Sequence, residues 1–293
     1  MRASTFATAL AALPTGFAML ATPKLSNLTA TPKHFGIVLF PGYQALDVFG
    51  PLDILNSFSM LFDQTMQLSI ISADLEPVST IPKPVSTIPK PSGKMNMTHG
   101  TFGQKLVPTH TFKQVLANGG QCGASSAAPA AVGHPHARQA GHAGMEKNST
   151  APGAPGPIEV LIIPGGSGTR QALTEEIDFV KQMYPKVKQI ISVCTGATLL
   201  SRAGVLDGRS ATSNKRSWDW VVSTGPNVNW KREARWVVDG NIWSSSGISA
   251  GMDVTYAWMA DTYGEDVADY QSKSLEYERW TDASRDPFAN IWA

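Results

Sequence analysis

The residue in this sequence with the clearest capacity for chemistry is Cys194. A strand is predicted at residues 189–193 and a helix at 195–203, so Cys194 lies where the chain turns from one into the other. The small residues Gly196 and Ala197 allow a sharp turn, as at a nucleophile elbow. The positive end of the helix is expected to favour the reactive thiolate over the thiol. The alternative is an inert core cysteine, because free cysteines are often buried.

Two further loops carry candidate groups and follow predicted strands in the same way. Asp47 follows a predicted strand at 35–40, and Gly165 and Gly166 follow one at 160–163. In parallel sheets ligands bind at the carboxyl ends of the strands, so the three loops are expected to converge. Asp47 is a candidate acid or base, or only the N-cap of the next helix. The two glycines offer backbone N–H groups that stabilise developing negative charge, or they only turn the chain.

These loops need a sheet that brings them together, and the alternation of strands and helices predicts one. Short apolar runs predict strands at 35–40, 66–71, 160–163 and 189–193. Helical spacing predicts helices at 46–60, 174–184, 195–203, 250–263 and 267–278. A hairpin is predicted at 236–243, with its turn at Asp239 and Gly240. The pattern therefore predicts an α/β fold with a flavodoxin-like, doubly wound, mostly parallel sheet and helices on both faces.

Composition narrows the class of function. The 24 Lys and Arg residues nearly balance the 23 Asp and Glu residues, which argues against a nucleic-acid surface. Two cysteines, Cys122 and Cys194, exclude a disulfide scaffold and a four-cysteine zinc site. No run approaches the roughly 20 apolar residues that a membrane helix needs. We therefore expect a small-molecule substrate, no nucleic-acid partner and no membrane span.

Three segments depart from the ordered pattern, which otherwise predicts a single domain at 34–293. Residues 1–33 lack any acidic residue and fit a secretory signal, a mitochondrial transit peptide or a disordered extension. Without a targeting role for that segment, we expect a cytoplasmic protein. Residues 77–92 hold a proline-rich tandem repeat, and prolines at this density predict an extended surface loop.

The third segment, residues 118–157, is rich in Ala, Gly and Pro and is predicted to be disordered, unless it is a gene-model artefact. It contains Cys122 together with His134, His136 and His142. These residues could be drawn as a metal site, but flexible, low-complexity surroundings argue against it. We therefore expect no metal.

The motifs around the candidate residues resemble the ThiJ/PfpI superfamily, whose fold is related to class I glutamine amidotransferases. The resemblance covers nearly everything outside the three segments, and within the superfamily it is closest to the isonitrile hydratases. The motifs that carry it lie at residues 40–47, 50–51, 163–168, 192–196, 203–209, 247–253 and 275–277.

The position of the histidines separates the reactions known in this superfamily. Amidotransferase-like and peptidase-like members use a histidine after the nucleophilic cysteine. Here Thr195 follows Cys194 directly, and no histidine occurs after His142. In isonitrile hydratases an acidic side chain pairs with the thiol instead, and Asp47 falls at that position.

The resemblance therefore implies cysteine-dependent hydration of an isonitrile to an N-formamide through a covalent thioimidate, without metal or organic cofactor. Cys194 would be the nucleophile and Asp47 the acid and base, while Gly165, Gly166 and Thr195 would stabilise the intermediate. Asn214 and Ile248 are candidate pocket residues, although many members have a histidine in the segment 211–214. The superfamily also implies a homodimer.

Two alternatives remain open. One is a glyoxalase-like or deglycase-like enzyme acting on α-oxoaldehydes, for which the acidic partner is usually Glu rather than Asp. The other is a non-catalytic redox-sensing or ligand-binding module in which Cys194 is oxidised.

Overall fold

The computed structural model describes residues 21–25, 31–83, 101–123 and 156–292. Its strands are β1 (His34–Val38), β2 (Gln67–Ser72), β3 (Val78–Ser79), β4 (Lys105–Leu106), β5 (His110–Thr111), β6 (Val160–Ile163), β7 (Gln189–Ser192), β8 (Ser210–Ala211), β9 (Asn229–Trp230), β10 (Trp236–Asp239) and β11 (Ile242–Ser245). Its α-helices are α1 (Ala45–Leu61), α2 (Phe112–Ala117), α3 (Thr174–Met183), α4 (Ala197–Arg202), α5 (Trp218–Thr224), α6 (Ala250–Tyr263) and α7 (Glu265–Ser274).

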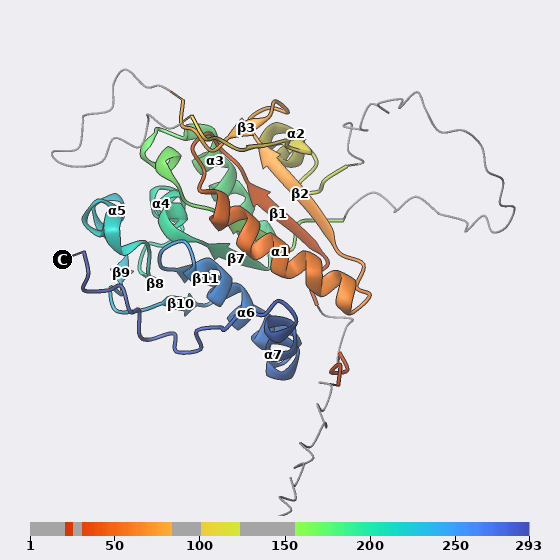
Figure 1. The fold of residues 1–293 in the computed structure, drawn as a ribbon. Helices are drawn as coiled ribbons and strands as arrows, with labels where there is room; N and C mark the ends of the chain where they lie inside the picture. Colours follow the sequence, from red (N-terminus) through yellow and green to blue (C-terminus); the bar gives the residue numbers. More distant parts are fainter. Residues whose placement is uncertain (1–20, 26–30, 84–100, 124–155, 293) are drawn as a thin grey trace, which may run out of the picture.

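A seven-stranded sheet forms the centre of the domain, in the strand order β10-β11-β7-β6-β1-β2-β5. All neighbouring strands are parallel except β10 and β11. Helices cover both faces: α1, α6 and α7 lie on one side of the sheet, and α3 and α4 lie on the other (Figure 1). The predicted α/β fold with a mostly parallel sheet is confirmed.

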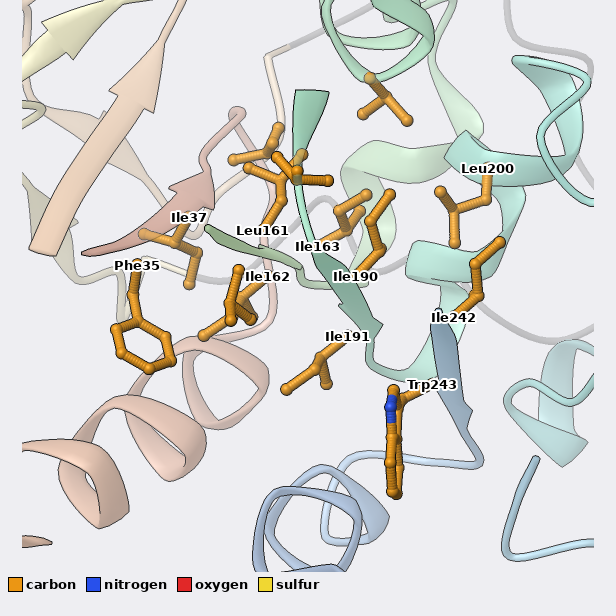
Figure 2. Close-up of a cluster of buried hydrophobic side chains, with 14 of the residues drawn as sticks. Phe35, Ile37, Leu161, Ile162, Ile163, Ile190, Ile191, Leu200, Ile242 and Trp243 are labelled. Atoms are coloured by element: carbon orange, nitrogen blue, oxygen red, sulfur yellow. The ribbon is translucent and has the colours of Figure 1, made fainter. Parts of the chain in front are cut away.

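The strand register separates the core side chains into two faces, as Figure 2 shows. One row across four strands consists of Ile37, Ile162, Ile191 and Trp243. The opposite face carries Leu161, Ile190 and Ile242. The first face packs against α6, where Trp258 meets the ring of Phe35 edge to face at 5.7 Å between centroids. Burial on both faces explains why the central strands are almost continuously apolar.

This register also brings the candidate loops together. β1 pairs with β6 and β6 pairs with β7, so the carboxyl ends of three adjacent strands lie side by side. The loop after β1 leads into α1 with Asp47, the loop after β6 carries Gly165 and Gly166, and the turn after β7 carries Cys194. The predicted convergence of the three loops is confirmed at the level of the backbone.

The C-terminal half of the chain contains the predicted hairpin and the last predicted helix. The hairpin at 236–243 is confirmed as β10 and β11, and Gly240 takes the left-handed conformation (φ +60°) in its turn. The last helix was predicted at 267–278, but α7 ends at Ser274. The chain leaves the helix there because Glu276 is left-handed (φ +51°), a conformation that a right-handed helix cannot continue.

The predictions for the segments 77–92 and 118–157 are partly wrong, because each segment contains residues that belong to the fold. Val78–Ser79 pairs antiparallel with Lys105–Leu106, so the proline-rich segment 77–92 is not a loop throughout. The strand forms because neither of these two residues is proline, and both can therefore donate to the ladder. Residues 118–123 belong to the fold, because Gln121 bridges to Pro157 and Cys122 is 1% exposed. Residues 84–92 and 124–155, with His134, His136 and His142, lie outside the described residues.

Most of the predicted N-terminal extension also lies outside the described residues. Within the described part, Thr22 is hydrogen bonded to the hydroxyl of Tyr270 in α7 at 3.0 Å. Across the described ranges, no helix has both the length and the apolar character needed to cross a membrane.

Candidate active site

Cys194 lies at a strained turn between β7 and a short 3₁₀ helix, Cys194–Gly196, that leads into α4. Its backbone is left-handed (φ +57°), which is uncommon for a residue with a side chain. The turn is fixed because the Cys194 N–H donates to the Ser246 carbonyl at 2.9 Å. Gly196 permits the close approach, since a Cβ there would lie 2.3 Å from the Ile163 carbonyl oxygen. The elbow geometry predicted for this cysteine is therefore present.

Asp47 lies in the first turn of α1 and is fully buried. The N-cap of this helix is Gln44, so the interpretation of Asp47 as the N-cap is wrong. Its Oδ2 accepts a hydrogen bond from the Gly165 N–H at 2.9 Å. Its Oδ1 is buried and has no hydrogen-bond partner among the described residues. A buried carboxyl oxygen without a hydrogen-bond partner is costly, and the cost is greatest when the group is ionised.

Burial raises the pKa of Asp47 to about 7. The Gly165 N–H and the Cys194 thiol oppose this rise, because both donate hydrogen bonds that favour the carboxylate. A carboxyl group with a pKa near neutrality can both accept and donate a proton at physiological pH. Asp47 therefore has the property required of a general acid and base.

Gly165 is needed for the close packing of these groups. A Cβ on Gly165 would lie 2.5 Å from the Thr195 nitrogen and 2.9 Å from Asp47 Oδ2. The sequence predicted that Gly165, Gly166 and Thr195 present N–H groups to an intermediate. In the structure the Gly165 N–H donates to Asp47, and the Gly166 N–H donates to the Thr195 hydroxyl at 3.0 Å. These two N–H groups hold the site's own side chains.

The electrostatic surroundings of Cys194 differ from the expected ones. Burial raises the pKa of the Cys194 thiol well above its usual value, and the charge of Asp47 raises it further. Hydrogen bonds from the Thr195 N–H, the Asn214 side chain and the Thr195 hydroxyl lower this pKa, but by less. The expectation that the helix end makes Cys194 a thiolate is therefore wrong. At neutral pH the group is a thiol beside a carboxyl of pKa about 7.

The two candidate pocket residues take different positions. The Oδ1 of Asn214 accepts the Ser217 N–H at 3.0 Å, which leaves its amide N–H₂ to donate to the Cys194 sulfur. Asn214 therefore lies at the reactive atom rather than at a distant pocket wall. Ile248 is half-buried in the turn before α6, two residues after the Ser246 whose carbonyl holds Cys194.

Three residues that contact the site were not found from the sequence. The Ser213 hydroxyl donates to the Cys194 carbonyl at 2.6 Å, and Ser246 accepts from the Cys194 N–H. The Thr169 hydroxyl donates to the Thr195 hydroxyl at 3.0 Å. Serines and threonines are common in loops, so no local pattern distinguishes these three. Their roles depend on strand pairing that brings distant segments together.

A hollow of about 600 Å³ lies on the outer side of α1, apart from this site. It is lined by apolar side chains of α1 and β2 and by residues of α6 and of the segment after α7, including Leu46, Phe49, Leu68, Met252 and Leu275. Neither Asp47 nor Cys194 lines it. In the described part of the chain, no three His, Cys, Asp or Glu side chains are placed to hold a metal ion.

Comparison with known proteins agrees with this fold and these motifs. The sequence pattern of the DJ-1/PfpI family matches residues 33–261, and the chain belongs to that family. Among solved structures, a ThiJ/PfpI family protein from Pseudomonas syringae superposes with a TM-score of 0.56. That structure is 22% identical and the match covers 89% of this chain and 84% of the other, so it supports the fold.

Curated relatives include enzymes of two kinds. The isonitrile hydratase of Pseudomonas putida is 25% identical over 246 residues, which are 83% of this chain and 78% of that protein. A deglycase of Pyrococcus abyssi is 35% identical over 109 residues, but the match covers only 36% of this chain and 61% of the deglycase. The family thus contains enzymes, and the longer match is to the isonitrile hydratase.

Proposed function

We propose that this protein is an enzyme that hydrates a small isonitrile to an N-formamide, with Cys194 as nucleophile and Asp47 as acid and base. The observation that carries the proposal is the buried pair itself. A thiol of raised pKa lies beside a carboxyl whose pKa is about 7 and whose Oδ1 has no hydrogen-bond partner among the described residues. The pair suits a reaction in which one proton moves from sulfur to carboxyl to substrate.

The isonitrile carbon is the electrophile in the first step. The Cys194 sulfur attacks this carbon and forms a C–S bond, while the thiol proton passes to Asp47. Asp47 then gives the proton to the same carbon, which yields a thioimidate, R–N=CH–S–Cys194, and an ionised Asp47. The hydrogen-bond donors of Thr195 and Asn214 stabilise the Cys194 sulfur as negative charge develops on it.

Water completes the reaction in the second step. Ionised Asp47 takes a proton from the water whose oxygen attacks the thioimidate carbon, and that proton goes to the substrate nitrogen. The hydroxyl proton of the resulting adduct returns to the active-site pair as the C–S bond breaks. The products are R–NH–CHO and free Cys194, so one water is consumed and the pair is restored. Every proton is moved by Asp47 and Cys194, and the proposed chemistry requires no cofactor.

A comparison of two substrates tests this proposal. Purified protein is incubated with cyclohexyl isonitrile and, separately, with methylglyoxal, and the products are identified by chromatography and mass spectrometry. The proposal predicts N-cyclohexylformamide from the first and no lactate from the second. Lactate without formamide would establish the α-oxoaldehyde alternative, and absence of both products would favour the sensing or binding module.

We also propose that the protein is a homodimer, as the resemblance implies. The exposed apolar residues Leu46, Phe49 and Leu275 around the hollow on α1 support a contact with a second copy. Sedimentation or multi-angle light scattering of the protein and of Phe49→Glu tests it. A dimer that Phe49→Glu converts to a monomer is expected, and a monomeric unmodified protein would contradict the proposal.

A further inference from the structure

Four charged side chains are buried together behind the elbow: Lys215, Arg235, Asp253 and Asp286. Each side chain is at most 7% exposed. Arg235 pairs with Asp253 at 2.6 Å and with Asp286 at 3.5 Å, and Lys215 lies 3.5 Å from Asp286. Burying charges is expensive even when they are paired, and apolar packing often gives equal stability. The cluster therefore invites a role other than stability alone.

Both peptide groups of Cys194 are held by serine residues next to this cluster. The Cys194 N–H donates to the Ser246 carbonyl at 2.9 Å, and the Cys194 carbonyl accepts the Ser213 hydroxyl at 2.6 Å. A local turn bond, from the Gly196 N–H to the Val193 carbonyl at 2.8 Å, closes the chain around Cys194, and these two contacts anchor its left-handed backbone from outside the turn. The position of the sulfur beside Asp47 therefore depends on where Ser213 and Ser246 are held.

The Lys215–Asp286 pair holds both serines. The Ser246 hydroxyl donates to Asp286 Oδ2. The Lys215 ammonium donates to the Ser213 carbonyl at 3.2 Å and lies 3.5 Å from the same Asp286 oxygen. Asp286 thus connects the segment that binds the Cys194 N–H with the segment that binds the Cys194 carbonyl.

Asp286 comes from the C-terminal segment after α7, which is tied down beside the hairpin. The Asp286 N–H donates to the Glu233 carbonyl at 2.6 Å, and the Arg235 N–H donates to the Ala283 carbonyl at 2.8 Å. The Ser246 N–H in turn donates to the Arg235 carbonyl at 2.9 Å. These backbone contacts fix the carboxylate against the elbow from the far end of the sequence.

We propose that Asp286 is a positioning residue for Cys194: through Ser246 and Lys215 it keeps the elbow in the backbone conformation that places the sulfur beside Asp47. The proposal rests on Cys194 as the reactive group of the proposed function, and it does not depend on the identity of the substrate. Asp286 touches no reacting atom.

The test measures the reactivity of Cys194 without any substrate. Wild type, Asp286→Asn and the control Asp282→Asn, which removes an exposed carboxylate from the same segment, are alkylated with iodoacetamide across a range of pH. Trypsin releases Cys194 in the peptide 189–202, whose labelling is followed by mass spectrometry, and Cys122 is followed in the same samples. Cys122 is also buried but lies in a different segment of the chain from Cys194, so its labelling reports general opening of the fold.

Loss of the Asp286 charge should free the elbow and move the sulfur away from burial and from Asp47. We expect the midpoint of the Cys194 pH profile to fall toward the ordinary cysteine value and labelling at about pH 8 to rise about fivefold or more. Labelling of Cys122 should stay at the wild-type rate, and Asp282→Asn should match wild type throughout. Isonitrile turnover, where present, should lose kcat while KM stays within about twofold.

A profile for Asp286→Asn that matches wild type would overturn the proposal, whatever the change in thermal stability. An equal acceleration of Cys194 and Cys122 labelling would also overturn it, because that result indicates general opening.

Ser246→Ala provides a second variant should Asp286→Asn not fold, because it removes only the hydroxyl that reaches Asp286 and leaves the charges paired. It should shift the profile in the same direction by a smaller amount, and no shift would also overturn the proposal. A shifted profile in a protein that does not hydrate isonitriles would uphold the positioning role and refute the proposed function.

Discussion

Replacing Asp47 with Asn removes the negative charge beside Cys194 and keeps the shape of the side chain. Because Asp47 is fully buried, solvent screens this charge poorly. Burial and the Asp47 charge are the two causes that raise the Cys194 pKa, and the substitution removes the second of them. The Cys194 pKa in Asp47→Asn should therefore be lower than in the wild type.

The size of the effect can be worked from the usual influence of a charge on a neighbouring titratable group. A charged group in contact shifts a pKa by about one to three units. At a pH below the pKa of the thiol, each unit by which that pKa falls increases the thiolate fraction about tenfold. The intrinsic nucleophilicity of the thiolate falls at the same time, by about the square root of that factor. Alkylation of Cys194 by iodoacetamide should therefore be roughly 3- to 30-fold faster in Asp47→Asn than in wild type at about pH 8.

The pH at which the difference appears identifies its cause. At about pH 8 wild-type Asp47 is mostly ionised, because its pKa is about 7. At about pH 5.5 it is mostly protonated, so wild type and Asp47→Asn should react at more similar rates. The exposed residue Asp53 on the same helix provides the control, and Asp53→Asn should behave as wild type at both pH values.

The assay follows alkylation of the peptide 189–202 by mass spectrometry over time. An equal acceleration at both pH values would mean that the substitution opens access to the sulfur. No acceleration at about pH 8 would mean that Asp47 does not act on the charge of Cys194. Either result would refute the electrostatic reasoning.

Isonitrile turnover should fall as the pH drops below about 7, by about tenfold per unit, because the proposed base form of Asp47 is then lost; a pH profile of kcat/KM checks this. Gly165→Ala should lower the free energy of unfolding by about 1–3 kcal/mol in urea titrations, because its Cβ would meet the Thr195 nitrogen at 2.5 Å. Thr195→Val should cost about 1–3 kcal/mol in the same measurement, since the Gly166 N–H loses its acceptor. Asn214→Ala should raise the Cys194 pKa and slow its alkylation at fixed pH, because one donor to the sulfur is removed.

The sequence was sufficient to predict which loops meet, but not the protonation state of the side chains that these loops carry. Asp47 and Cys194 follow strands of one parallel sheet, and such strand ends must meet at one edge. The pKa of Cys194 depends on its burial and on its contact with Asp47. The sequence shows only that a helix is predicted to begin after this cysteine, and that pattern reveals neither of the two. Desolvation of the buried thiol raises its pKa by more than the hydrogen bonds to the sulfur lower it.

Contacts between distant segments account for the other omissions. Asp286 meets Ser246 and Lys215 only because the C-terminal segment folds back onto the hairpin. A single Asp in a polar tail gives no pattern from which this return could be predicted. Cys122 was assigned to a low-complexity segment by composition, but composition cannot show that the first residues of that segment still pack on the sheet.

In the proposed reaction Cys194 forms a covalent bond to the isonitrile carbon. The most direct test is to mix the protein with excess cyclohexyl isonitrile, stop the reaction with acid during turnover, and search the peptide 189–202 for an added mass. We expect an adduct of one isonitrile on Cys194 in wild type and in Cys122→Ala, and neither adduct nor formamide in Cys194→Ala. Formamide production by Cys194→Ala at the wild-type rate would contradict the proposed reaction.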